Sequence, residues 1–299
     1  MNSGEKMDKI EESKKIVDSY YEKQTPSEED DFQFVEALNY LIEKTGDLKY
    51  ATQLGGYYYG QKKFDLALKY YLLGAEANDK YALIGLAYIY YYGRCGEVDY
   101  DQAFKYYSWA SELGVDEATL KISDMYFKGR GTKRNVEKSK EILNNLYEKE
   151  KNTKLVYSVF PEVVIRLSSS WIKDNKKKKA YEELIKAKDL IKSRLIYKAD
   201  FGEFKNMELI VNKIYDCIDF DKSNMDIYDL FYYFKKLGKV SFKYDNKTYI
   251  INSDMDGRFI SLEFEGKWYQ EIKEFFMRAS IDNKKISSLV YYIYEVKGE

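Results

Sequence analysis

The chain has 299 residues, of which 45% are hydrophobic and 33% are charged, a composition typical of a folded protein. Its 49 lysines and arginines balance 50 aspartates and glutamates, so the net charge of -1 gives no reason to expect a polyanion as the main partner. The chain has no histidine. That absence excludes Ser-His-Asp and Cys-His catalytic arrangements and zinc sites with imidazole ligands.

The two cysteines, Cys95 and Cys217, are too few for a disulfide framework or for a thiolate metal site, so we expect no metal and no cofactor. The first residues are too charged for a secretory signal, and no run approaches the roughly 18 apolar residues of a membrane span. We therefore expect a cytoplasmic protein with no membrane partner. The abundance of Lys, Tyr, Ile and Asn is typical of AT-rich bacterial or phage genomes.

Apolar residues recur at helical spacing from residue 7 to about residue 220. A first helix is expected from Met7 to Tyr21. The second helix is expected to open at Thr25, whose hydroxyl caps it. Pro26 would then stand at the first helical position, and the carboxylate of Glu28 would reach back to the cap.

Paired helices then repeat along the chain with a period of 36 residues. Five positions of one first helix recur in the next one: Ala82, Leu86, Ala87, Tyr90 and Gly93 return as Ala118, Ile122, Ser123, Tyr126 and Gly129. An earlier copy is offset by 32 residues in its first helix, because its loop is shorter. Small residues at these positions allow close helix packing, and the aromatic residues fill the space between successive pairs.

Helix ends recur as well. Asp99 and Asn135 stand where a side-chain oxygen can cap the second helix of a pair. Gly114 and Asn78 fall at helix ends, where a left-handed backbone is common.

The segments AYIYYYGRCG at 87–96 and YFKGRG at 126–131 share a pattern of Tyr, two residues and a glycine-bounded loop. A capping residue follows, and a small residue stands four positions later. This pattern resembles the Sel-one-like (SEL-like) repeats of the tetratricopeptide-repeat superfamily, over about residues 48–150. The resemblance implies an α-solenoid of antiparallel helix pairs that binds a protein or peptide on its concave face. The third copy ends at Glu150 where a glycine is usual, so we expect the regular array to stop there.

Residues 152–220 keep helical spacing but lose the period. Pro161 is expected to break or kink the segment from 155 to 171. Helices are expected over 176–194 and 204–218, where they would cap the apolar end of the array. The predicted domains are a helical-repeat domain at 1–150, a helical cap at 151–221 and a small α+β domain at 222–299.

The last domain begins with a short expected helix that contains Ile227, Leu230, Phe231 and Phe234. Alternating hydrophobicity from Val240 onward then predicts a three-stranded antiparallel sheet, with turns at 245–246 and 256–257. A helix over 269–277 and a final helix with Ile286, Leu289, Val290 and Ile293 on one stripe are expected after it. The predicted fold class is therefore mainly α, a solenoid followed by a small α+β domain.

Several segments have alternative chemical interpretations. The Gly93–Gly96 loop could cradle a phosphate, but it lacks a Walker lysine and a preceding strand and recurs at Gly129–Gly131. We interpret it as a structural turn. Cys95, beside Arg94, could have a lowered thiol pKa, but without a histidine partner we interpret it as a loop or packing residue.

Charged runs are interpreted in the same way. The alternating carboxylates of Glu97, Asp99 and Asp101 lack the glycine and the distal glutamate of a calcium loop, so they predict a solvated loop and a helix cap. The only hint of nucleic-acid binding is a lysine run followed at once by two glutamates, which we interpret as a solvated helix end. The run consists of Lys176, Lys177, Lys178 and Lys179.

Tyrosine offers a large contact area with little loss of entropy, which suits an interface. In stacked helix pairs the first helix of each pair lines the concave side, so its residues that packing does not need face a partner. The candidate partner-binding residues are Tyr57, Tyr88, Tyr92, Lys121, Asp124 and Lys128. Tyr88 and Tyr92 are expected to be replaceable without disturbing the packing of the repeat.

The favoured hypothesis is a non-enzymatic scaffold that binds a protein or peptide. An inhibitor or immunity-type protein that blocks one partner is a special case that the sequence does not separate from it. The alternative is a regulator that contacts nucleic acid or senses a peptide. A third hypothesis is an enzyme whose C-terminal domain uses Asp, Glu, Lys or Tyr, which requires a concave pocket there.

Overall fold

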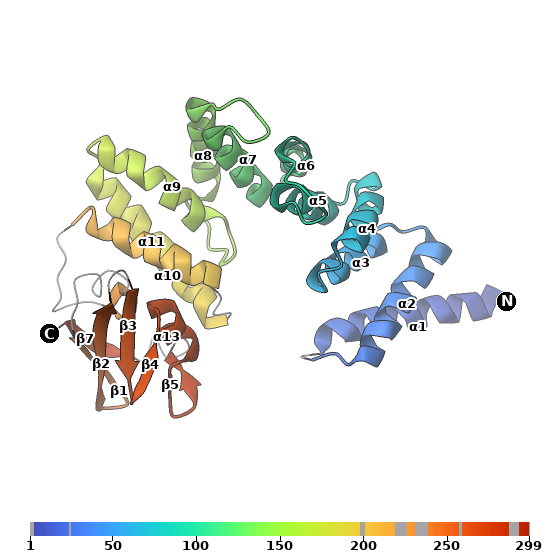
Figure 1. Cartoon of the computed structure of the whole chain (residues 1–299). Coiled ribbons are helices and arrows are strands. Elements are labelled where there is room, and N and C mark those ends of the chain that lie inside the picture. The colour runs from blue at the N-terminus through green and yellow to red at the C-terminus, as the bar shows by residue number, and fades with distance from the viewer. Residues whose placement is uncertain are drawn as a thin grey trace. The chain divides into compact units, whose positions relative to one another are not determined.

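The computed structural model describes residues 3–23, 25–197, 201–218, 226–230, 239–256, 259–286 and 293–298. The chain divides into two compact units, Met1–Ile142 and Leu143–Glu299. The described part of the first unit is built from helices alone, whereas the second combines helices with a small sheet (Figure 1). The predicted domain boundaries after residues 150 and 221 stay predictions.

The first unit opens with α1 (Ser3–Glu22) and α2 (Glu28–Thr45). Ser27, not Thr25, caps α2. The Ser27 hydroxyl accepts a hydrogen bond from the Asp30 amide at 3.2 Å, and the Asp30 carboxylate accepts one from the Ser27 amide at 2.9 Å. Lys23 pairs with the same carboxylate and, with these hydrogen bonds, lowers the pKa of Asp30 to about 2. The predicted capping motif is therefore present but lies two residues further along the chain, where Lys23 also forms an ion pair with Asp30.

Three helix pairs follow, as the periodicity predicts. Their bounds are α3 (Lys49–Gly60), α4 (Phe64–Glu76), α5 (Lys80–Tyr92), α6 (Tyr100–Glu112), α7 (Asp116–Lys128) and α8 (Val136–Glu150). The recurring alanines of these helices are fully buried: Ala67, Ala82, Ala103 and Ala118.

Close packing in the repeats surrounds the ring of Tyr71 on α4. A Cβ atom added to Gly55 of α3 or to Gly85 of α5 would lie 2.5 Å from this ring. Only glycine leaves room for an aromatic ring against both first helices. Tyr71 thus joins the first pair of the array to the second.

The predicted helix ends are confirmed. Asp99 accepts a hydrogen bond from the Gln102 amide at 2.9 Å, and Asn135 accepts one from the Lys138 amide at the same distance. Asn78 and Gly114 both adopt a left-handed backbone, with φ of 55° and 82°. The capping and turn signals were thus local enough to be predicted from the sequence.

The loops within the second and third pairs turn at glycines, whereas the first turns at Lys62, which has a φ of 58°. Gly93 has a φ of 61° and Gly131 a φ of 64°. A Cβ atom on Gly131 would lie 2.0 Å from the carbonyl oxygen of Tyr100, which belongs to the preceding pair. The glycine loops are therefore structural turns that also allow one pair to approach the next.

Replacing Gly131 by alanine should destabilise the first unit by at least about 2 kcal/mol, because the left-handed backbone and the contact with a carbonyl oxygen both oppose a side chain. Urea unfolding followed by circular dichroism measures this loss. Gly60→Ala is the matched control, since an added Cβ meets nothing there within 4 Å. Equal stability of the two variants would contradict the prediction.

After the last turns of α8, the second unit contains three helices: α9 (Phe160–Lys173), α10 (Lys177–Tyr197) and α11 (Phe201–Tyr215). Pro161 lies in the first turn of α9, where its missing amide costs nothing. The predicted break therefore takes the form of a helix start at Phe160. Of the lysine run at the start of α10, Lys179 lies over the rings of Tyr147 and Trp171, 4.6 Å from each centroid.

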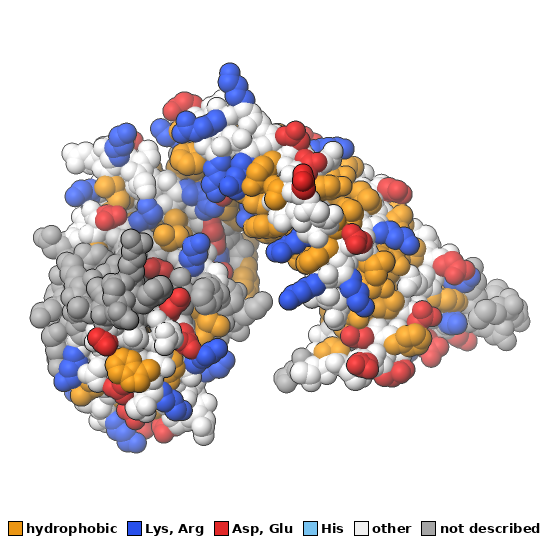
Figure 2. All heavy atoms as spheres, in the orientation of Figure 1, with side chains coloured by type: hydrophobic (Ala, Val, Ile, Leu, Met, Phe, Trp, Pro, Cys, Tyr) orange, Lys and Arg blue, Asp and Glu red, His pale blue; other side chains and the backbone are white. Residues whose placement is uncertain are grey.

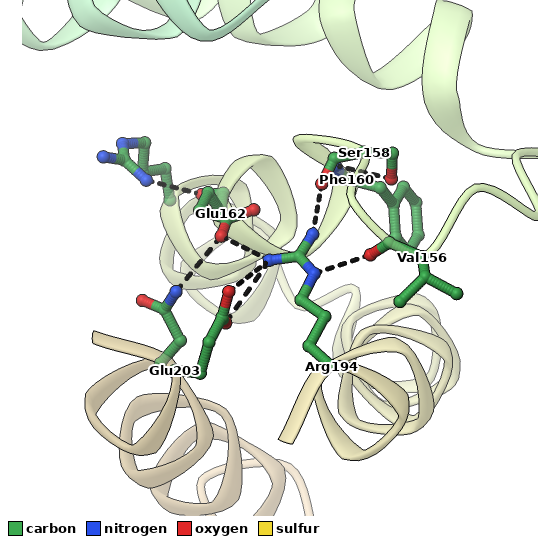
Figure 3. A network of polar contacts seen from close by, with 8 residues as sticks. Val156, Ser158, Phe160, Glu162, Arg194 and Glu203 are labelled. Atoms are coloured by element: carbon green, nitrogen blue, oxygen red, sulfur yellow. Dashed lines mark hydrogen bonds and ion pairs between the residues drawn. The ribbon is translucent and has the colours of Figure 1, made fainter. Parts of the chain in front are cut away.

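Arg194 of α10 holds the segment that precedes α9 (Figure 3). Its guanidinium donates to the carbonyl oxygens of Val156, at 2.6 Å, and of Ser158. The same group pairs with Glu162 at 2.8 Å and with Glu203 at 3.2 Å, and the arginine side chain is only 4% exposed. One buried cation thus connects α9, α10, α11 and the backbone before α9.

Replacing Arg194 by alanine should destabilise the second unit by about 3–5 kcal/mol, because the cation that pairs with Glu162 and Glu203 and donates to two carbonyl groups would be lost. Denaturant unfolding of the full chain measures the effect. Arg278→Ala is the control: that arginine is 73% exposed and pairs with Glu274 at the surface, so its loss should cost less than about 1 kcal/mol. A similarly small effect of Arg194→Ala would show that the buried network contributes little.

A five-stranded antiparallel sheet completes the second unit, in the order β4-β3-β2-β1-β7. Its strands are β1 (Lys239–Tyr244), β2 (Lys247–Asp256), β3 (Phe259–Phe264), β4 (Lys267–Tyr269) and β7 (Tyr294–Gly298). Helix α13 (Ile272–Arg278) packs on the buried face, where the Phe264 and Phe275 rings meet at 5.5 Å. A short hairpin, β5 (Ser280–Ile281) and β6 (Lys284–Lys285), follows it, and the 3₁₀ turn η1 (Ile227–Asp229) precedes the sheet.

The three predicted strands are present as β1, β2 and β3, but a sheet of only three strands was wrong. β4 is only three residues long, and β7 follows the segment expected to be the last helix. The helix expected to start at Tyr269 starts at Ile272, because Tyr269 belongs to β4. Residues 231–238 and 287–292, where parts of two other expected helices fall, lie outside the described residues.

Candidate partner-binding surface

The last two turns of α5 carry three tyrosines whose rings meet. The Tyr88 and Tyr92 rings, four residues apart, stack with centroids 5.8 Å apart. Tyr91 meets Tyr92 edge to face at 5.0 Å. Below them the ring of Tyr107, which is 1% exposed, supports Tyr88 at 6.1 Å and Tyr91 at 6.3 Å. The surface rings thus stand on the buried core of the repeat.

Helix α7 of the next pair completes the contacts of Tyr88. The Tyr88 hydroxyl donates to the carboxylate of Glu117 at 2.6 Å, and the Lys121 ammonium lies 5.7 Å from the centroid of the Tyr88 ring. Burial and the Glu117 carboxylate raise the pKa of Tyr88 well above the usual value. The expectation that Tyr88 is not needed for packing was therefore wrong, since it joins α5 to α7.

Two arginines from the loops within the pairs cover the neighbouring rings. The Arg94 guanidinium lies 5.3 Å from the Tyr92 ring and 5.4 Å from the Phe64 ring. Arg130 lies 4.9 Å from the Tyr100 ring and donates to the Tyr91 hydroxyl at 2.7 Å. We call this group the tyrosine–arginine surface; its residues are Tyr88, Tyr91, Tyr92, Arg94, Lys121 and Arg130.

Tyr92 is the most accessible ring of this surface, with 46% of its area exposed. Figure 2 shows hydrophobic side chains gathered over the visible face of the repeat helices, with lysine and arginine side chains among them. An exposed ring that its neighbours fix in place can contact a partner without losing much conformational freedom.

The structure brings together three of the predicted site residues: Tyr88, Tyr92 and Lys121. Asp124, which is half-buried, and Lys128, which is exposed, lie about one and two turns beyond Lys121 on α7.

Tyr57 lies elsewhere, against the N-terminal helix pair. Its ring is 5.6 Å from that of Phe34 and 6.3 Å from that of Tyr20. Burial, together with a hydrogen bond to Asp31, raises the pKa of Tyr57 to about 12. These contacts give Tyr57 a packing role between the first repeat and α1–α2.

Sequence reasoning missed Tyr91, Glu117 and the two arginines. Arg94 and Arg130 directly follow Gly93 and Gly129, so they are separated by the same 36 residues as the rest of the repeat. The recurrence of an arginine at this position of the repeat could have indicated that the two arginines belong to the site. The hydrogen bond between Tyr88 and Glu117, 29 residues apart, had no counterpart in the sequence pattern.

The other chemical interpretations gain little from the geometry. Cys95 is an exposed residue, but partial burial of its thiol and the nearby Asp65 carboxylate raise the pKa of that thiol. A nucleophilic cysteine needs the opposite shift. Among the described residues, no three Cys, Asp or Glu side chains gather to hold a metal ion. Within the same ranges, no helix is long and apolar enough to cross a bilayer.

The exposed face of the sheet carries a shallow hollow lined by Lys239, Thr248, Ile250, Asn252, Glu263 and Glu265. The Glu263 carboxylate accepts hydrogen bonds from the Asn252 side chain and from the Gly266 amide, both at 2.7 Å. These contacts fix the strand and the turn, so they give this carboxylate a structural role.

Comparison with family models identifies the helix pairs. A model described as Sel1 repeat matches residues 49–79, 80–115 and 116–144. Residues 49–144 are three Sel1 repeats. Their bounds coincide with the pairs α3–α4, α5–α6 and α7–α8 to within a few residues, and such repeats generally form scaffolds for protein interactions. No curated protein matches the chain.

One solved structure shows a similar fold at a TM-score above 0.5. A protective antigen of uropathogenic Escherichia coli strains, described as displaying an SLR fold, matches with a TM-score of 0.51 and 17% identity, over 72% of this chain and 48% of its own. A Sel1 repeat protein from Oxalobacter formigenes matches with a TM-score of 0.46 and 18% identity, over 67% of this chain and 77% of its own. This chain thus spans about half the length of the E. coli protein.

The raised pKa of Tyr88 predicts how the stability of the Sel1 repeats depends on pH. The phenol stays protonated in the folded chain while it ionises in the unfolded chain above about pH 10. Its contribution is therefore complete below pH 10 and declines as the pH rises further, by at most about 1.4 kcal/mol per pH unit.

Denaturant unfolding at several pH values from 9 to about 12 tests this. Tyr88→Phe should lose stability less steeply above pH 10 than the unchanged chain. The control is Tyr81→Phe, at a ring that is 65% exposed, which should leave the slope unchanged. Parallel curves for all three proteins would contradict the assigned environment of Tyr88.

Proposed function

We propose that the Sel1 repeats bind a protein or peptide through the tyrosine–arginine surface and that the protein acts as a scaffold without catalysing a reaction. The observation that carries this proposal is the accessible ring of Tyr92, held by Tyr88, Tyr91 and Arg94. Lys121, Asp124 and Lys128 on α7 extend the same surface in the proposal. The inhibitor or immunity-type role is a special case that would use the same residues.

Three properties of the surface support binding. Its rings are fixed by the buried Tyr107, so docking does not have to order them. Its cations lie over ring faces, where they keep free donors for a partner. Tyrosine and arginine are also the residue types that most often dominate interface energetics.

The rival hypotheses have weaker support in the described residues. Lys179 of the lysine run already contacts two aromatic rings, which reduces the case for a nucleic-acid site. Two carboxylates line the hollow on the sheet, and the hydrogen bonds of Glu263 are structural, which weakens the case for an acid and base pair with Glu265. The expected cytoplasmic location stays a prediction.

Site-specific photocross-linking in the native cell tests the proposal. A benzophenone amino acid at position 92 should form a discrete adduct with one partner, because this ring faces the proposed interface. The matched control carries the same group at position 81, also an exposed tyrosine of α5 but at the opposite end of the helix.

The adduct at position 92 should also weaken strongly when Lys121→Ala is added, since this cation lies in the same surface. Equal adducts at positions 81 and 92, or none at either, would overturn the proposal. Circular dichroism of each variant confirms that the helical content is retained.

A further inference from the structure

The loops within the three pairs lie beside one another. They are residues 61–63, 93–99 and 129–135. Arg94 of the second loop contacts Phe64, which directly follows the first loop. Arg130 of the third loop contacts Tyr100, which directly follows the second loop. These contacts make one continuous edge of the Sel1 repeats, which we call the loop edge.

The loop edge is basic. It carries six cations against two acidic residues: Lys62, Lys63, Arg94, Arg130, Lys133 and Arg134 against Glu97 and Asp99. The loops that connect successive pairs, residues 46–48, 77–79 and 113–115, contain Asp47 and Asp79 and no cation. The positive charge is therefore concentrated in the loops within the pairs, although the whole chain is nearly neutral.

One cation recurs at the same place in each repeat. Lys62, Arg94 and Arg130 are separated by 32 and 36 residues, the offsets of the first helices. Within the described ranges, none of the six cations forms an ion pair with an acidic side chain. Arg94 and Arg130 are instead held over aromatic rings, so they are already positioned and keep donors to offer.

We propose that the loop edge binds an extended acidic segment of the partner protein, whose carboxylates meet Lys62, Arg94 and Arg130 in turn. This inference rests on the proposed function and specifies the chemistry of the partner. A helix with its side chains is about 10–12 Å across, so successive loops of the edge are expected at about that spacing, and an extended peptide advances about 3.3 Å per residue. An acidic residue at every third position would therefore match successive repeats.

A peptide fits this edge better than a nucleic acid does. The middle loop contributes Glu97 and Asp99, which would repel a continuous polyanion but leave room for separated carboxylates. The planar guanidinium groups of Arg94 and Arg130 suit bidentate binding of a carboxylate. Tyr92, beside Arg94, offers an apolar contact for the residues between the carboxylates.

Fluorescence anisotropy with the full chain tests the proposal. The probe is a fluorescein-labelled peptide of about twelve residues with glutamate at every third position and serine or leucine between. Two comparison probes are a peptide of the same composition with its glutamates in one block and an oligothymidylate of similar length. The spaced peptide should bind most tightly, and its affinity should fall as salt is raised above about 50 mM.

The decisive variant is the double substitution Arg94→Ala with Arg130→Ala, which should weaken binding of the spaced peptide at least tenfold. The matched control is Lys80→Ala with Lys105→Ala, because these lysines also lie over tyrosine rings of the same unit but outside the loop edge. The control should bind within twofold of the unchanged chain. If the arginine variant loses its fold, Lys62→Ala with Arg94→Ala replaces it.

Equal loss in the two double variants, or no loss in either, would overturn the acidic-segment proposal. Tighter binding of the oligothymidylate would overturn it in favour of a nucleic-acid partner. The cross-link at position 92 separates the two levels of inference. If the unchanged chain does not bind the spaced peptide while the position-92 adduct persists in the arginine variant, the acidic segment is refuted and the proposed function stands.

Discussion

The helical array depends on one steric constraint, the fit of an aromatic ring between two glycines. Tyr71 occupies the space that side chains at Gly55 and Gly85 would fill, so α4 approaches both first helices at once. One repeat later Tyr107 stands at the corresponding position of α6 and is almost wholly buried. Because dense packing tolerates little change of volume, this constraint sets the spacing of the first two pairs.

The candidate surface is a direct extension of this packing. Tyr107 supports Tyr88 and Tyr91 from below, and Glu117 and Lys121 of the following pair hold Tyr88 from the side. A binding surface on separate loops would have to be ordered when its partner docks. Here the buried residues that stack the repeats also fix the exposed rings, so stability and recognition share one set of contacts.

What the sequence predicted well was local or periodic. The helix pairs, the caps at Asp99 and Asn135 and the left-handed turns follow from spacing and from single residue types. The start of α2 was misplaced because two overlapping capping motifs compete and Lys23 favours the second. The strands β4 and β7 were missed because one is very short and the other pairs with β1, more than 50 residues earlier in the chain. Contacts between pairs, such as that of Tyr88 with Glu117, could not be predicted from the spacing of residues within one helix.

Arg130 has a consequence for how such an array can change in length. It belongs to the third repeat, yet its guanidinium contacts Tyr91 and Tyr100 of the second, as Arg94 reaches back to Phe64 of the first. Each repeat therefore finishes the surface of the repeat before it, and the last repeat has no successor to finish its own. An array of this kind contains one complete surface fewer than it has repeats. Duplication of a repeat adds a whole surface in one step, whereas deletion of the last repeat also removes the arginine that completes its neighbour.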